Sequence, residues 1–232
     1  MDPEVKAKII NQLTAMAQAP VRALKKIQID TIDLNPFLLR ILGLNTPESI
    51  AEFCVSQRVE RSVVTIYGTR VQRIAKEICG RGTGVEGADI CVEEDGRRYY
   101  VQIKAGPNTT NKDIVNSINR LLHSAERRDE NGVGLLGMTY GTRDRVSSIT
   151  QRYSSIDWLI GREFWEFISN DPLCAESIFE LAGQVAERSA NEGELYSDLY
   201  KKKVKELADE IGQKYARPDG TIDWEKLFDA CM

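Results

Sequence analysis

The sequence feature that most restricts the fold is a tight-turn signal within residues 86–111, which read EGADICVEEDGRRYYVQIKAGPNTTN. Asp95 and Gly96 both tolerate the positive φ that a type I′ turn requires. A two-residue turn at this point pairs Glu94 with Arg97 and fixes the register of every pair farther out. We therefore expect two antiparallel strands joined at this turn.

The register brings three polar side chains onto one face of the hairpin. Asp89 falls opposite Gln102, with the two side chains roughly 5 Å apart. Lys104 lies two residues beyond Gln102 and points to the same face. The hairpin thus carries a carboxylate, an amide and an ammonium group on one face. The opposite face is apolar and suited to a core, and it is formed by Ile90, Val92, Val101 and Ile103. This arrangement indicates a chemical site.

The same residues resemble the active-site signature of the PD-(D/E)xK nuclease superfamily, and most closely in style that of Type II restriction endonucleases. Asp89 is followed, after twelve residues, by Gln102-Ile103-Lys104. Two positions depart from the usual pattern. Ala88 stands where proline is usual, and Gln102 stands where an acid is usual, an arrangement similar to that of Mrr-like restriction enzymes. The resemblance extends over roughly residues 60–140.

The resemblance implies an α/β fold, with a restriction-endonuclease-like core in which helices flank a central mixed β-sheet. Apolar periodicity predicts further helices before and after this core. Buried strands are expected at 133–140 and 156–160. We divide the chain into an N-terminal helical region, a catalytic core and a C-terminal helical region, or one compact domain containing all three, with boundaries at 1–55, 56–165 and 166–232.

The resemblance also implies which groups bind a metal ion. Asp89, Gln102 and the backbone carbonyl of Ile103 would be ligands of Mg²⁺, which prefers oxygen atoms. Lys104 would orient or deprotonate the attacking water, or stabilise charge in the transition state. One more carboxylate would help, and the spacing does not choose among the candidates Glu60, Glu77 and Glu86.

The function that we expect is Mg²⁺-dependent, sequence-specific cleavage of double-stranded DNA by a homodimer, as in a Type II site-specific deoxyribonuclease. One alternative is a PD-(D/E)xK nuclease for repair or junction cleavage. The other is a DNA-binding module that keeps the fold without catalysis. Intact Asp89 and Lys104 argue against this last alternative.

Two segments are candidates for DNA contact. Arginine can pair with guanine and aspartate can accept from cytosine, so Arg143-Asp144-Arg145 is suited to a G·C-rich target. The alternative is a salt bridge within a solvated turn. The second segment precedes a helix and suits a DNA phosphate, or is a plain connector; its candidate residues are Asn108, Thr109 and Asn111.

Composition excludes several other classes of protein. No apolar run approaches the ~18 residues of a membrane span. Five scattered cysteines without CxxC pairs indicate reduced thiols in a cytoplasm and argue against a zinc site. The single histidine, His123, makes histidine-dependent nuclease chemistry unlikely. A net charge of −4 counts mildly against a nucleic-acid partner, although arginines cluster locally.

Overall fold

The computed structural model describes residues 1–80, 86–191 and 196–232. Contacts between residues divide the chain into two units, each built from two segments. The first unit comprises Met1–Ala15 and Tyr67–Ala186, and the second comprises Met16–Ile66 and Glu187–Met232.

The boundaries of these two units differ from the boundaries of the three regions expected from the sequence. Helices α4 (Pro47–Cys79) and α8 (Cys174–Asn191) both pass from one unit to the other. Composition does not change along either helix, so the sequence carries no signal for these boundaries. The three-part division stays a prediction.

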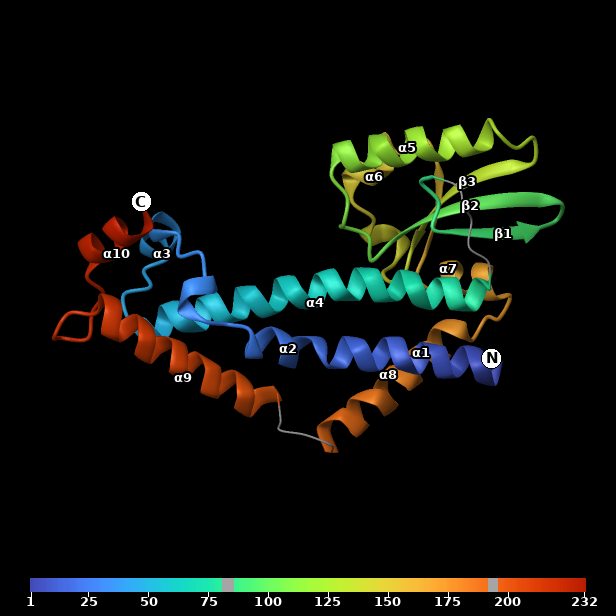
Figure 1. The fold of residues 1–232 in the computed structure, drawn as a ribbon. Helices are drawn as coiled ribbons and strands as arrows, with labels where there is room; N and C mark the ends of the chain where they lie inside the picture. The colour runs from blue at the N-terminus through green and yellow to red at the C-terminus, as the bar shows by residue number, and fades with distance from the viewer. Residues whose placement is uncertain (81–85, 192–195) are drawn as a thin grey trace. The chain divides into compact units, whose positions relative to one another are not determined.

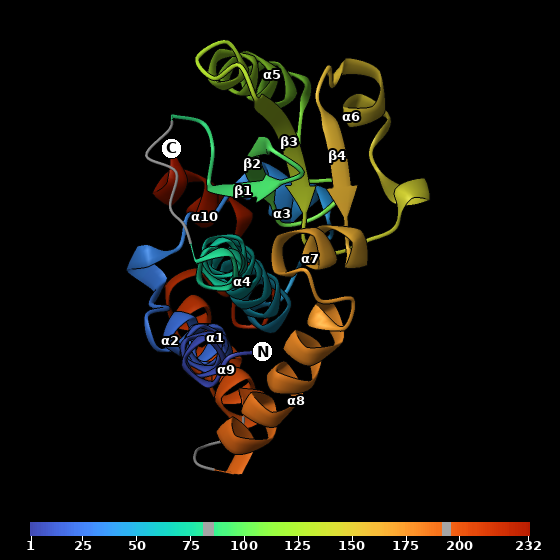
Figure 2. The same cartoon turned by 90° about the vertical axis from the view of Figure 1, so that its right-hand side faces the viewer.

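The first unit contains a four-stranded mixed sheet, as the fold class predicted (Figures 1 and 2). The strand order is β1-β2-β3-β4, with β1 antiparallel to β2 and the other neighbours parallel. The strands are β1 (Ile90–Glu94), β2 (Arg97–Lys104), β3 (Gly132–Met138) and β4 (Asp157–Ile160).

The predicted hairpin and its register are confirmed. Asp95 and Gly96 form the turn with φ values of 50° and 74°. Glu94 pairs with Arg97, and the ladder continues to the pair formed by Ile90 and Val101. Ile90, Val101 and Ile103 are fully buried, so the apolar face of the hairpin packs in a core.

Helices cover both faces of the sheet. Helices α5 (Lys112–Glu126) and α6 (Ser148–Tyr153) lie on one face (Figure 1), over a cluster that includes Tyr100, Leu122 and Leu136. On the other face lies α7 (Arg162–Ser169), where Phe164 packs so close to Gly137 that no side chain would fit there. The 67–79 part of α4 reaches β2 on the edge where β1 begins, and α1 (Pro3–Ala17) is tied to it by a hydrogen bond from Arg70 to Gln12.

Both ring nitrogens of His123 have hydrogen-bond partners. Its Nδ1 lies 2.6 Å from a carboxylate oxygen of Glu126, and its Nε2 lies 2.8 Å from the hydroxyl of Ser155. The other carboxylate oxygen of Glu126 accepts the amide of Gly134. These contacts join the end of α5 to β3 and to the segment that precedes β4.

Helix α4 is one continuous element of 33 residues, so Gly68, a residue that can end a helix, does not interrupt it. The helix begins after Thr46, whose hydroxyl accepts the amide of Ser49, and ends before Gly80, which has a φ of 67°. A glycine inside a helix costs only about 1 kcal/mol relative to alanine. Good helix formers and tertiary packing on both sides of Gly68 outweigh that cost.

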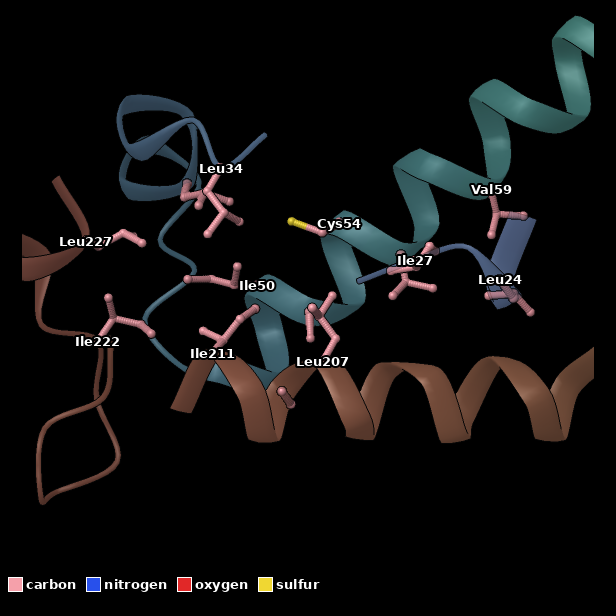
Figure 3. Packing of buried hydrophobic residues seen from close by; sticks show 14 residues of the cluster. Leu24, Ile27, Leu34, Ile50, Cys54, Val59, Leu207, Ile211, Ile222 and Leu227 are labelled. Carbon is pink, nitrogen blue, oxygen red and sulfur yellow. The ribbon is translucent and has the colours of Figure 1, made fainter. Parts of the chain in front are cut away.

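The second unit is helical and has a core of its own. It contains α2 (Ala19–Lys25), η1 (Ile29–Thr31), α3 (Pro36–Ile41), α9 (Tyr196–Tyr215), α10 (Trp224–Cys231) and the 47–66 part of α4. Figure 3 shows Ile50 and Cys54 of α4 near Ile211 and Leu207 of α9. The expected helix start at Leu195 lies outside the described residues.

Two further features of the chain concern membrane-spanning helices and disulfide bonds. In the described ranges, no helix joins sufficient length with enough apolar residues to cross a lipid bilayer. No disulfide joins any of the five cysteines, all of which lie in the described ranges: Cys54, Cys79, Cys91, Cys174 and Cys231.

Candidate active site

The candidate site forms where β1 begins and β2 continues beyond it. The last ladder pair is Ile90 with Val101, so Ile103 has no strand partner on that side. Asp89 takes the place of that partner. Its amide donates to the Val101 carbonyl, and its Oδ2 accepts the Ile103 amide, both at 2.8 Å. The carboxylate is therefore fixed against β2, with its side chain 23% exposed.

Helix α4 contributes two further side chains that the sequence did not point to. Gln72 Nε2 donates to the Ile103 carbonyl at 3.1 Å, and Lys76 Nζ lies 4.0 Å from Asp89 Oδ1. A spacing of four residues places both on one helix face. Polar residues at that spacing beside buried Val71 and Ala75 were the available signal, but helical periodicity does not reveal which strand a helix faces.

Gln102 and Lys104 project from β2 toward the face that α5 covers. Their neighbours in β3 are Leu136 and Met138, which belong to the cluster beneath α5. Gln102 Oε1 is buried and has no hydrogen-bond partner in the described part of the chain. A buried acceptor without a partner costs about 1–3 kcal/mol, so such an atom usually serves a water molecule, an ion or a reaction.

Lys104 is half-buried near the end of β2. No carboxylate of residues 1–80, 86–191 or 196–232 forms a salt bridge with its ammonium group. The backbone carbonyl of Lys104 accepts the amide of Thr139, which fixes this end of the strand. The side chain thus presents a positive charge without an internal counterion.

Glu60, Glu77 and Glu86 each stay a prediction for the additional carboxylate of the metal site. Glu77 lies 3.5 Å from Lys8. Glu86 is exposed, three residues before Asp89. Glu60 belongs to the second unit. Among the described residues, no group of three or more His, Cys, Asp and Glu side chains is placed to hold a metal ion.

The donor set nevertheless fits a hard cation. Asp89 provides a carboxylate, Gln102 an unpartnered amide oxygen, and Ile103 a carbonyl that still has one lone pair besides the one used by Gln72. All three are oxygen donors, which Mg²⁺ prefers over nitrogen and sulfur. With one carboxylate, the set carries less negative charge than the usual acid pair.

The segment expected to recognise bases forms a short 3₁₀ helix, η2 (Arg143–Arg145). The guanidinium of Arg143 makes two contacts with the carboxylate of Glu163 on α7, at 2.9 and 2.8 Å. A hydrogen bond from Thr142 lowers the pKa of Asp144, and Arg145 is exposed. The main ion pair therefore reaches another helix instead of closing within the turn.

The residues expected to contact phosphate lie in the loop between β2 and α5. Asn111 caps α5, because its Oδ1 accepts the Ile114 amide at 2.9 Å. The Thr109 hydroxyl donates to the Gly106 carbonyl, and Asn108 is exposed. The ring of Tyr140 packs so close to Gly106 that a side chain there would collide with it.

Comparison with known protein families shows which family this chain belongs to. Residues 3–191, most of the chain, match the family described as Type II restriction endonuclease EcoO109I. The chain belongs to this family. Comparison with curated proteins gave no match. Membership in the EcoO109I family agrees with the resemblance seen around Asp89 and Lys104, and it supports a nuclease of the Type II restriction kind.

The bond between Asp89 and Ile103 can be tested without any assay of activity. Asp89→Ala leaves the buried Ile103 amide without an acceptor, so we expect the free energy of unfolding to fall by about 1–3 kcal/mol. Asp89→Asn keeps an acceptor oxygen and should stay closer to the parent protein. Urea denaturation measures both, with Glu86→Ala as the exposed control. Equal stability of the Ala and Asn variants would show that this bond does not hold the edge of β2.

Proposed function

We propose that the protein is a Mg²⁺-dependent, sequence-specific double-strand DNA endonuclease, that is, a Type II site-specific deoxyribonuclease. The observation that carries this proposal is the buried Gln102 Oε1, which has no hydrogen-bond partner among the described residues, on the strand whose Ile103 amide also fixes the Asp89 carboxylate. Membership in the EcoO109I family supports the restriction-type activity. Asp89, Gln102 and Lys104 are proposed as the catalytic residues.

In this proposal, Asp89, Gln102 and the Ile103 carbonyl hold Mg²⁺. The chemistry that Mg²⁺ supplies in such a site is polarisation of a phosphoryl oxygen and activation of water. Asp89 needs little reorganisation to act as a ligand, because the Ile103 amide already orients it. Gln72 positions the Ile103 carbonyl. Lys104 holds the attacking water by a hydrogen bond and stabilises the negative charge that builds on the phosphate.

The proposed substrate is duplex DNA, and the proposed position for reading its bases is η2. Arg145 and Asp144 are exposed and need no rearrangement to contact base edges. Arg143 must first leave Glu163, so its release would be coupled to DNA binding. Asn108, Thr109 and Asn111 are proposed to contact the backbone beside the site.

We also propose that the enzyme acts as a homodimer in the cytoplasm. Each chain carries one candidate site, whereas a duplex has two strands to cut. In the second unit, α3 and α10 expose an apolar group that soluble monomers rarely leave uncovered, namely Phe37, Leu38, Ile41, Leu42, Phe228 and Met232. Light scattering should give twice the mass of one chain. A monomer at micromolar concentration and on DNA would contradict this part.

Two alternatives are separated from the main proposal by one experiment. The protein is incubated with a long natural DNA and Mg²⁺, and the products are separated on a gel. Discrete bands support restriction-type specificity. A smear identifies a less specific nuclease of the same superfamily, and unchanged DNA identifies a binding module without catalysis.

Substitution of Lys104 tests the assignment of the site. Lys104→Ala should abolish cleavage but leave DNA affinity within about tenfold, because its charge acts at one phosphate among many contacts. Cleavage kinetics and fluorescence anisotropy measure the two effects. Lys226→Ala, which removes an exposed charge from α10, serves as the control. Substantial cleavage by Lys104→Ala would remove this residue from the site.

Substitution of Gln102 tests whether its oxygen is used. Gln102→Glu restores the commoner acid in nearly the same shape, so activity should persist, with a changed dependence on Mg²⁺ concentration. Gln102→Ala removes the oxygen and should be far less active. Initial rates over a Mg²⁺ titration distinguish the variants. If all three proteins have the same rates, Gln102 takes no part in the reaction.

A further inference from the structure

Two exposed cations from different helices lie over the same aromatic ring. Lys112 is the first residue of α5, and Arg152 is in the last turn of α6. The Lys112 ammonium lies 4.8 Å from the centroid of the Tyr153 ring, and the Arg152 guanidinium lies 5.6 Å from it. Figure 1 shows α6 beside the N-terminal end of α5. Lys112, Arg152 and Tyr153 are called the cation cluster below.

In the part of the chain that the structure describes, no carboxylate neutralises the positive charge of the cation cluster. Within the described ranges, neither Lys112 nor Arg152 forms a salt bridge with a carboxylate. Asp113 follows Lys112 directly, but adjacent helix residues point about 100° apart. The N-terminus of α5 adds a positive helix dipole, which favours anions and disfavours a lysine. An external anion would relieve all of these repulsions.

The cation cluster stands on a cross-linked support. The hydroxyls of Thr110 and Thr150 lie 2.8 Å apart, and the Pro107 carbonyl accepts the Ser147 amide. Asn119 of α5 donates to the carbonyl of Tyr153. Because these contacts fix α6 to α5 and to the loop before it, an anion would meet cations whose helices are already in place. Binding then costs little ordering entropy.

The cation cluster is within reach of a duplex held at the candidate site. Lys112 lies eight positions after Lys104, and eight residue steps span at most about 28 Å when the chain is fully extended. One turn of B-DNA is about 34 Å long. A duplex whose scissile phosphate meets Lys104 therefore has further backbone phosphates at this distance.

We propose that Lys112 and Arg152 bind backbone phosphates of the DNA duplex that flanks the candidate active site. The inference rests on the proposed function, since it requires that DNA is the substrate. Contacts of this kind position the duplex and carry no sequence information. Tyr153 keeps the two cations together, so that they meet neighbouring phosphates as a unit.

The test uses the double variant Lys112→Ala with Arg152→Ala. Its affinity for a labelled duplex of about 30 base pairs is measured by anisotropy without Mg²⁺, over about 50–300 mM KCl. Loss of two phosphate contacts should reduce the slope of log affinity against log salt by about 1.8 and lower the affinity tenfold or more near 0.1 M salt. Arg127→Ala with Arg128→Ala removes the same charge from the other end of α5 and should leave both quantities unchanged.

A charge-preserving variant guards against a misfolded protein. Lys112→Arg with Arg152→Lys should bind like the parent, and thermal unfolding checks every variant. An alanine variant that keeps the affinity and salt slope of a DNA-binding parent overturns the inference. So does an equal loss in the Arg127 and Arg128 control, because net charge alone would then explain it. A parent protein that binds no DNA instead overturns the proposed function, and with it the inference.

Discussion

The hydrogen bond from the Ile103 amide to the Asp89 carboxylate is the contact on which the candidate site depends. It replaces a strand pair just before β1 begins, so the Ile103 amide at the edge of β2 still has a hydrogen-bond partner. Because the bond uses one carboxylate oxygen, the other faces Lys76 across 4.0 Å. The hydrogen bond that satisfies the Ile103 amide therefore also fixes Asp89 in the proposed active site.

Local signals predicted the sheet well. The Asp95-Gly96 turn fixed the register that brings Ile90 opposite Val101, because turn geometry and strand alternation act over neighbouring residues. The observed ladder ends at this pair, and Asp89, predicted opposite Gln102, bonds instead to the backbone of Val101 and Ile103. Helix caps are equally local: Asn35, Asn111 and Asp223 each accept a backbone amide three residues farther along the chain.

Features that depend on distant packing were not predictable from one sequence. Gln72 reaches Ile103 only because α4 passes close to the end of β2, and Arg143 meets Glu163 only because α7 folds back toward η2. The continuity of α4 through Gly68 is decided by packing along its length, which local propensity does not include. The unpartnered Gln102 oxygen depends on everything that buries it, so no sequence pattern would have revealed it.

The discontinuous make-up of the first unit has a consequence for synthesis on the ribosome. Residues 1–15 leave the ribosome before residues 67–186, yet the two segments belong to one unit. Ile9 and Leu13, both buried in the finished protein, must therefore wait in the nascent chain until much of the unit has been translated. Long waits of this kind slow folding and expose apolar side chains to other molecules. Residues 1–15 thus reach their final environment only after later parts of the first unit have been made.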